Sequence, residues 1–180
     1  MGAKTPLCLA FICAAALLAA QGQEGGLISG HGWGLLVATP GGWVRDTQAI
    51  PPAGVDALFR KAGERYSPFG LSISLVSRDR DPGDPGTFAE FLADQKAALL
   101  ASDAGVEVRD LKDYAPGLGY RFAMRELEEP GKGFYQAIAY YDGNRAFFSL
   151  VLSCRSAEER DRERSALVEL LDSFVYLSQE

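Results

Sequence analysis

Few side chains in this sequence could carry nucleophilic or metal chemistry. His31 is the one histidine among 180 residues, and it lies between Gly30 and Gly32 in a glycine-rich stretch. Nucleophilic catalysis needs a serine or cysteine activated by a neighbouring base, which is usually histidine. A zinc site needs several nitrogen, sulfur or oxygen ligands held in a defined geometry. We therefore predict no catalytic residue, no metal ligand and no cofactor, and interpret His31 as an exposed linker residue.

The cysteines are Cys8, Cys13 and Cys154. Cys8 and Cys13 lie in an N-terminal segment that we expect to be removed, and neither follows a sequence typical of a lipid-anchor site. Cys154 would then be alone, so no internal disulfide could form. Because Cys154 ends an apolar strand pattern, we predict a buried, inert thiol; the alternative is a reactive thiol or an intermolecular disulfide.

Two groups of carboxylates could bind calcium or catalyse hydrolysis. The stretch 79–84, followed by Glu90, resembles a calcium loop, but its fifth position is Gly83 and its sixth is Asp84, whereas such a loop needs an oxygen ligand at the fifth and glycine at the sixth. We interpret it as a connection between a strand and a helix.

The densest carboxylate group is formed by Glu126, Glu128 and Glu129. A glycosidase needs two carboxylates that converge across a cleft. This group lies at the end of a predicted strand, beside Pro130 and Gly131, and we predict a solvated turn.

The first 22 residues have the pattern of a secretory signal peptide. Lys4 precedes the apolar run 7–18, and the small residues Ala19, Ala20 and Gly22 suit a signal peptidase. The run is too short to span a bilayer and lacks a basic flank after it. We predict cleavage near residues 20–22 and a periplasmic or secreted protein with no integral membrane segment.

After the signal peptide, we predict a glycine-rich lead-in over 23–32 and a single domain over 33–178. Eighteen Lys and Arg against 24 Asp and Glu give a net charge of −6. An acidic chain of this kind argues against nucleic acid and anionic membranes as partners.

Apolar patterns predict the elements of this domain. Strands are expected at 33–38, 43–44, 71–76, 106–111, 120–127, 134–141, 145–154 and 175–177, and a short helix at 55–61. Two longer helices begin with capping boxes, Thr87 with Glu90 and Ser156 with Glu159. The strands 134–141 and 145–154 are apolar on both faces, so we expect them in mid-sheet with helices on each side.

The last helix changes character along its length. Leu167, Leu170, Leu171 and Phe174 form an apolar stripe, whereas the first two turns are charged, so we expect those turns to project into solvent. The exposed charges predict a possible protein-binding surface made of Glu158, Arg160, Asp161 and Arg164, with Arg78 and Asp81 of the 78–84 loop in second place.

The order of these elements resembles the PsbP-like superfamily, which includes the photosystem protein PsbP, DcrB-type envelope proteins and the Ran-binding protein Mog. The likeness rests on the Pro-Gly-Gly-Trp turn at 40–43, the capped helix at 87–101, the aromatic hairpin at 140–148 and the Leu-Asp-Ser-Phe ending at 171–174. It implies an α+β fold in which an antiparallel β-sheet of about six strands is sandwiched between α-helices. The histidine-containing metal site of photosystem members does not carry over, because His31 lies outside the predicted core.

These observations lead to one expectation of function. We expect an exported, non-catalytic binding or accessory protein of the bacterial cell envelope, with an envelope protein as its partner. The alternatives are an envelope hydrolase that uses Asp and Glu chemistry and a carrier of a small apolar ligand.

Overall fold

The computed structural model describes residues 25–47, 53–68, 70–80, 83, 86–102 and 105–178. The strands are β1 (Gly25–Gly30), β2 (Trp33–Ala38), β3 (Trp43–Arg45), β4 (Ala57–Lys61), β5 (Ser72–Asp79), β6 (Glu107–Asp110), β7 (Ala123–Glu129), β8 (Phe134–Asp142), β9 (Ala146–Cys154) and β10 (Val175–Ser178). The helices are α2 (Phe88–Ser102) and α3 (Ala157–Asp172), with a 3-10 turn, η1 (Pro130–Lys132). The predicted signal peptide, Asp81 and Asp84 lie outside the described residues.

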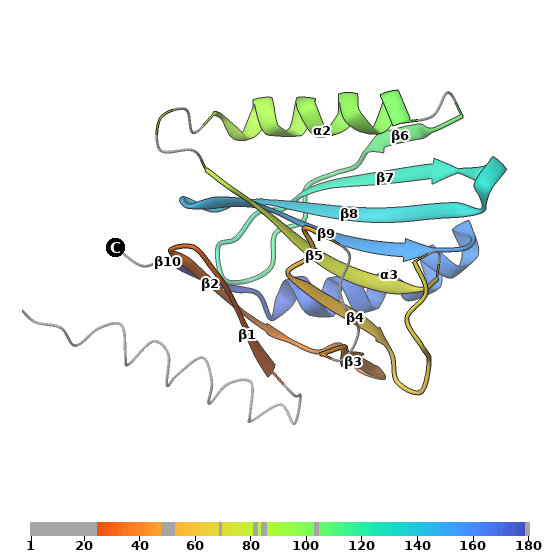
Figure 1. The fold of residues 1–180 in the computed structure, drawn as a ribbon, viewed down its shortest axis with the longest axis horizontal. Coiled ribbons are helices and arrows are strands. Elements are labelled where there is room, and N and C mark those ends of the chain that lie inside the picture. Colours follow the sequence, from red (N-terminus) through yellow and green to blue (C-terminus); the bar gives the residue numbers. More distant parts are fainter. Residues whose placement is uncertain are drawn as a thin grey trace, which may run out of the picture.

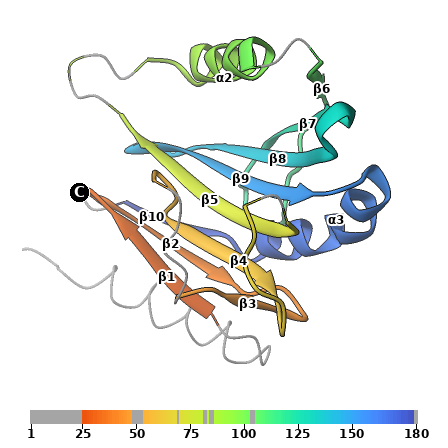
Figure 2. The same ribbon diagram turned by 45° about the vertical axis from the view of Figure 1, so that its right-hand side comes forward.

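The strands form two antiparallel sheets, which makes the fold α+β as predicted. One sheet has seven strands in the order β3-β4-β5-β9-β8-β7-β6, and the other has three in the order β1-β2-β10. Helix α2 covers one face of the large sheet, whereas α3 and the small sheet cover the other (Figures 1 and 2). The prediction of about six strands between helices is therefore corrected in detail, because a second sheet shares one layer with α3.

The two strands that are apolar on both faces lie in mid-sheet, as predicted. On β8, Ala137 and Ala139 belong to the core beneath α3, and Ile138 and Tyr140 belong to the core beneath α2. The hairpin that joins β8 to β9 closes with a hydrogen bond from the Gly143 N–H to the Ala146 carbonyl oxygen, 3.0 Å. Large aromatic side chains fill the space between the large sheet and α3, including Phe122, Phe148 and Phe174.

Two predicted segments fold differently. Residues 57–61 form strand β4, where we predicted a short helix, because Ala57 and Phe59 alternate into the core and pair with Leu75 and Ile73 of β5. A run this short has no clear period in the sequence.

The predicted glycine-rich lead-in is also wrong over Gly25–Gly30, which forms β1 and pairs along its whole length with β2. Gly30 is required there because the Trp33 indole lies against its backbone, and a Cβ at Gly30 would come within 2.2 Å of the ring. His31 is exposed, as predicted, but it lies in the turn between β1 and β2 and not in a linker.

The capping box at α2 forms as predicted, whereas at α3 the serine cap forms but the Glu159 carboxylate accepts from Arg155 instead of Ser156. The Glu90 N–H donates to Thr87 Oγ1 at 3.2 Å, and the Thr87 N–H donates to Glu90 Oε2 at 2.7 Å. At α3, the Glu159 N–H donates to Ser156 Oγ at 3.1 Å, while Glu159 Oε2 accepts from the Arg155 N–H at 2.8 Å. Among the described helices, none is long and apolar enough to cross a bilayer.

We expect Ser156→Ala to lower the free energy of unfolding by about 1 kcal/mol, because it leaves the Glu159 N–H without its cap. Ser165→Ala is the matched control: Ser165 is exposed within α3, and alanine there should be neutral or slightly stabilising. Urea denaturation of both variants measures the difference. Equal stability of the two would contradict a capping role for Ser156.

Candidate protein-binding site at the β6–β7 edge

The first turns of α3 face the sheet, and the prediction that they project into solvent is wrong at two positions. Arg160 is 4% exposed and Glu163 is 8% exposed. Both continue the stripe of Leu167 and Leu170 toward the helix N-terminus at helical spacing, so the same face that packs the apolar core also carries these charges. Arg160 and Glu163 can be buried because each side chain forms an ion pair. Glu163 pairs with Lys61 of β4 at 2.7 Å, and Arg160 has partners on β7.

Arg160 meets carboxylates of β7. Its guanidinium lies 2.7 Å from Glu128 Oε1 and 3.8 Å from Glu126 Oε2. On its other side Arg160 contacts Asp161 at 3.2 Å. Arg160 is therefore a buried anchor between α3 and β7, and it is not part of an exposed binding surface.

Glu126 is the centre of this cluster. Its side chain is 5% exposed, and it pairs with Arg109 of β6 at 2.5 Å and with Arg164 of α3. This corrects the prediction of a solvated turn, because Glu126 lies inside β7 with its side chain under α3. Burial alone raises the pKa of Glu126, but the hydrogen bonds from Arg164 and Arg109 and the charge of Arg160 outweigh it, so the pKa lies below its usual value.

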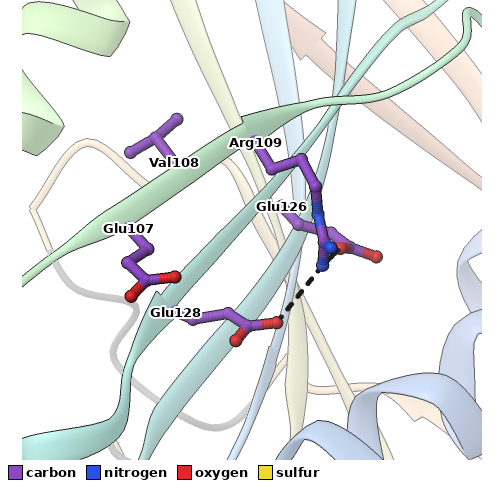
Figure 3. A pocket seen from close by; sticks show the side chains of 5 residues that line it. All are labelled: Glu107, Val108, Arg109, Glu126 and Glu128. Carbon is purple, nitrogen blue, oxygen red and sulfur yellow. Dashed lines mark hydrogen bonds and ion pairs between the residues drawn. The ribbon is translucent and has the colours of Figure 1, made fainter.

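A small hollow of about 130 Å³ opens beside this cluster, lined by Glu107, Val108, Arg109, Glu126 and Glu128 (Figure 3). Glu107 of β6 lies directly opposite Glu128 of β7 in the strand register. Two like charges in such a position destabilise a sheet. Glu128 is compensated by Arg160 and by Arg109 at 3.4 Å, whereas Glu107 has no ion pair within the described ranges.

We call the exposed or partly exposed charges around this hollow the charged edge surface: Glu107, Arg109, Glu128, Asp161 and Arg164. Buried contacts hold all of them except Glu107, because Arg109 and Arg164 both pair with the buried Glu126, and Glu128 and Asp161 pair with the buried Arg160. The surface combines two strands and a helix into one arrangement of mixed charges.

The same contacts disfavour a general-acid role for Glu126. A general acid must hold its proton near neutral pH, which requires a raised pKa. Glu126 has a lowered pKa and is occupied by arginines. Within the part of the chain that the structure describes, there is no cluster of three or more His, Cys, Asp or Glu side chains that could hold a metal ion.

The structure separates the residues that the sequence suggested for one binding surface. Arg78 pairs with Phe147 at one end of β9, whereas α3 follows Cys154 at the other end, so Arg78 lies at the opposite end of the sheet from the start of α3. Glu158 and Asp161 are exposed, as predicted. Asp81 lies outside the described residues.

Sequence reasoning missed Glu107 and Arg109. The only signal in the sequence was that the charged Glu107 and Arg109 flank the apolar Val108 in a short strand. The pairing of Arg109 with Glu126 depends on the register between β6 and β7, which no local pattern indicates. Cys154 is 1% exposed, as predicted, and burial raises the pKa of its thiol to about 12, which keeps the sulfur protonated and unreactive.

Comparison with known proteins identifies the fold alone. No protein-family model and no curated protein matches the chain. Among solved structures it is similar to the solution structure of cyanobacterial PsbP (CyanoP) from Synechocystis sp. PCC 6803, with 18% sequence identity and a TM-score of 0.50 over 86% of this chain and 94% of that one. The fold is therefore PsbP-like, which confirms the resemblance drawn from the order of elements.

Proposed function

We propose that this chain is an exported, non-catalytic binding or accessory protein of the bacterial cell envelope, periplasmic or secreted, and that the charged edge surface docks a protein partner. The secretory pattern of the first 22 residues supports the location. The main support for binding is that Glu126 ties β6, β7 and α3 together beneath exposed charges.

A surface held in this way suits recognition. Side chains that are already ordered lose less conformational entropy when a partner binds. Mixed charges in a fixed arrangement select a complementary partner and oppose others, which gives specificity more than affinity. Glu107, which has no ion pair among the described residues, is the member best placed to receive a basic side chain from that partner.

The test is charge reversal at exposed positions. Glu158 lies on α3 one helical turn before Asp161 and borders the charged edge surface. We expect Glu107→Lys combined with Glu158→Lys to reduce partner recovery about tenfold, which is the scale of one lost charge pair at an interface. Recovery is measured by proximity labelling from the secreted or envelope fraction of the native organism, followed by quantitative mass spectrometry. Thermal melting should change little, because both side chains are exposed.

Arg78→Glu is the matched control, since it also reverses an exposed charge but lies at the opposite end of the sheet. It should leave recovery unchanged. Equal recovery by the double variant and wild type would remove the charged edge surface as the docking site. A labelled set that matches that of an unrelated exported protein would contradict the binding function itself.

A further inference from the structure

Strand β6 forms one edge of the large sheet, and alternate backbone groups of this strand face away from the sheet. Directly after β6, the Leu111 N–H donates to the Met124 carbonyl oxygen of β7 at 2.9 Å. In an antiparallel ladder, residues that bond to the neighbouring strand alternate with residues that do not. The odd-numbered residues of β6 therefore bond to β7, and the backbone N–H and C=O groups of Val108 and Asp110 face outward.

These outward groups have no partner in the part of the chain that the structure describes. No hydrogen bond there uses the backbone of Val108 or Asp110. At the opposite edge of the large sheet, by contrast, the Trp43 N–H of β3 donates to the Pro40 carbonyl oxygen at 3.0 Å. Unpaired backbone groups on an edge strand are a template to which an extended segment of another chain can add. At β6 the large sheet can therefore be extended by a further strand.

The side chains of β6 select the kind of segment that can add there. Charged side chains on an edge strand oppose pairing with apolar strands, and β6 carries Glu107, Arg109 and Asp110. Glu107 lies opposite Glu128 of β7, and it has no ion pair among the described residues. Figure 3 shows the Glu107 and Glu128 side chains next to each other, with Val108 on the opposite side of β6. A lysine or arginine of an added strand, placed opposite Glu107, would compensate this pair of like charges.

We propose that the protein partner of the charged edge surface adds an extended, antiparallel strand to β6, with a lysine or arginine opposite Glu107. This inference rests on the proposed function and specifies how the partner binds. The partner residue that faces Val108 forms two backbone hydrogen bonds with it, and the next residue of the partner lies opposite Glu107, where facing Cα atoms are about 4.5 Å apart. The antiparallel direction follows that of every strand pair in the large sheet, and it is slightly more stable per residue than the parallel one.

Two short peptides test the charge. Their sequences are Thr-Ser-Val-Lys-Thr and Thr-Ser-Val-Glu-Thr, with blocked ends, so they differ only at the residue opposite Glu107 when their valine faces Val108. Each is added at millimolar concentration to the purified protein, and binding is followed through the amide NMR signals of Val108 and Asp110. We expect wild type to bind the lysine peptide about fivefold more tightly than the glutamate peptide, the scale of reversing one cross-strand charge. In Glu107→Lys this preference should reverse, and the same preference in both proteins would overturn the pairing with Glu107.

N-methylated forms of the lysine peptide test the hydrogen bonds. In the added strand the valine N–H faces β6, whereas the N–H of the lysine that follows it faces away. N-methylation of the valine should weaken binding about tenfold, because it removes one backbone hydrogen bond. N-methylation of the lysine is the matched control and should leave the affinity within about twofold, because that N–H makes no bond to β6. Equal weakening by the two methyl groups would contradict the addition of a strand.

Separate measurements distinguish strand addition from the docking role of the charged edge surface. Unchanged amide signals of Val108 and Asp110 with the lysine peptide at millimolar concentration would overturn strand addition. The docking role is measured by partner recovery with the double variant Glu107→Lys and Glu158→Lys, which requires only that the charges of this surface contact the partner. Reduced recovery together with unchanged peptide signals would therefore keep the charged edge surface as the docking site and overturn only the added strand.

Discussion

Replacing Phe148 by alanine is expected to lower the free energy of unfolding by about 3–5 kcal/mol, which is typical of removing a fully buried aromatic side chain. Phe148 is 0% exposed and lies on β9, the central strand of the large sheet. Its ring meets Trp33 edge-to-face at 4.9 Å and Tyr176 at 5.6 Å. It therefore joins the large sheet to β2 and β10, and its removal would leave a cavity between the two sheets.

The measurement is chemical denaturation followed by tryptophan fluorescence, with Leu118→Ala as control. Leu118 is 64% exposed, so its truncation should change stability by no more than about 0.5 kcal/mol. Phe147→Ala tests the opposite face, because Phe147 stacks on Phe91 of α2 at 4.5 Å. A loss below about 1 kcal/mol for Phe148→Ala would contradict the role of β9 as a strand buried on both faces.

The sequence predicted this part of the fold because its signals are local or periodic. Apolar residues on both sides of 134–141 and 145–154 left mid-sheet as the only position where both faces could be covered. Thr87 and Ser156 marked the helix starts through side chains that act within one turn. These features depend on neighbours in sequence, so a single chain is enough to see them.

The rest depends on contacts between distant segments. Arg160 and Glu163 have the same residue types and spacing as a solvated helix face, and only the carboxylates and lysine opposite them allow burial. Strand β1 looked like a linker because its glycines suit one, yet Gly30 is needed for close approach of Trp33. In both cases the deciding partner lies on another element, and no local pattern indicates it.

Glu126→Gln is expected to lower the free energy of unfolding by about 3 kcal/mol at neutral pH, the lower end of the range for breaking a buried ion pair. The loss is moderated because Arg160 keeps Glu128 at 2.7 Å and Asp161 at 3.2 Å. Arg109 and Arg164 would lose their shared carboxylate charge, and the link between β6 and α3 would weaken. Glu107→Gln is the matched control, since it removes a carboxylate from the same hollow and should be neutral or slightly stabilising.

The pH dependence of the stability difference between wild type and Glu126→Gln tests whether that difference is electrostatic. The pKa of Glu126 in the folded chain lies below its ordinary value of 4.5, so the unfolded chain binds the proton more readily as the pH falls. The contribution of Glu126 to stability is therefore complete above 4.5 and disappears as the pH falls through the lowered folded pKa. Urea denaturation of wild type and Glu126→Gln should show a gap that is widest at neutral pH and closes in acid. A gap of the same size at neutral and acid pH would mean that Glu126 acts through packing and not through its charge, and the charged edge surface would then lose the anchor on which its fixed geometry depends.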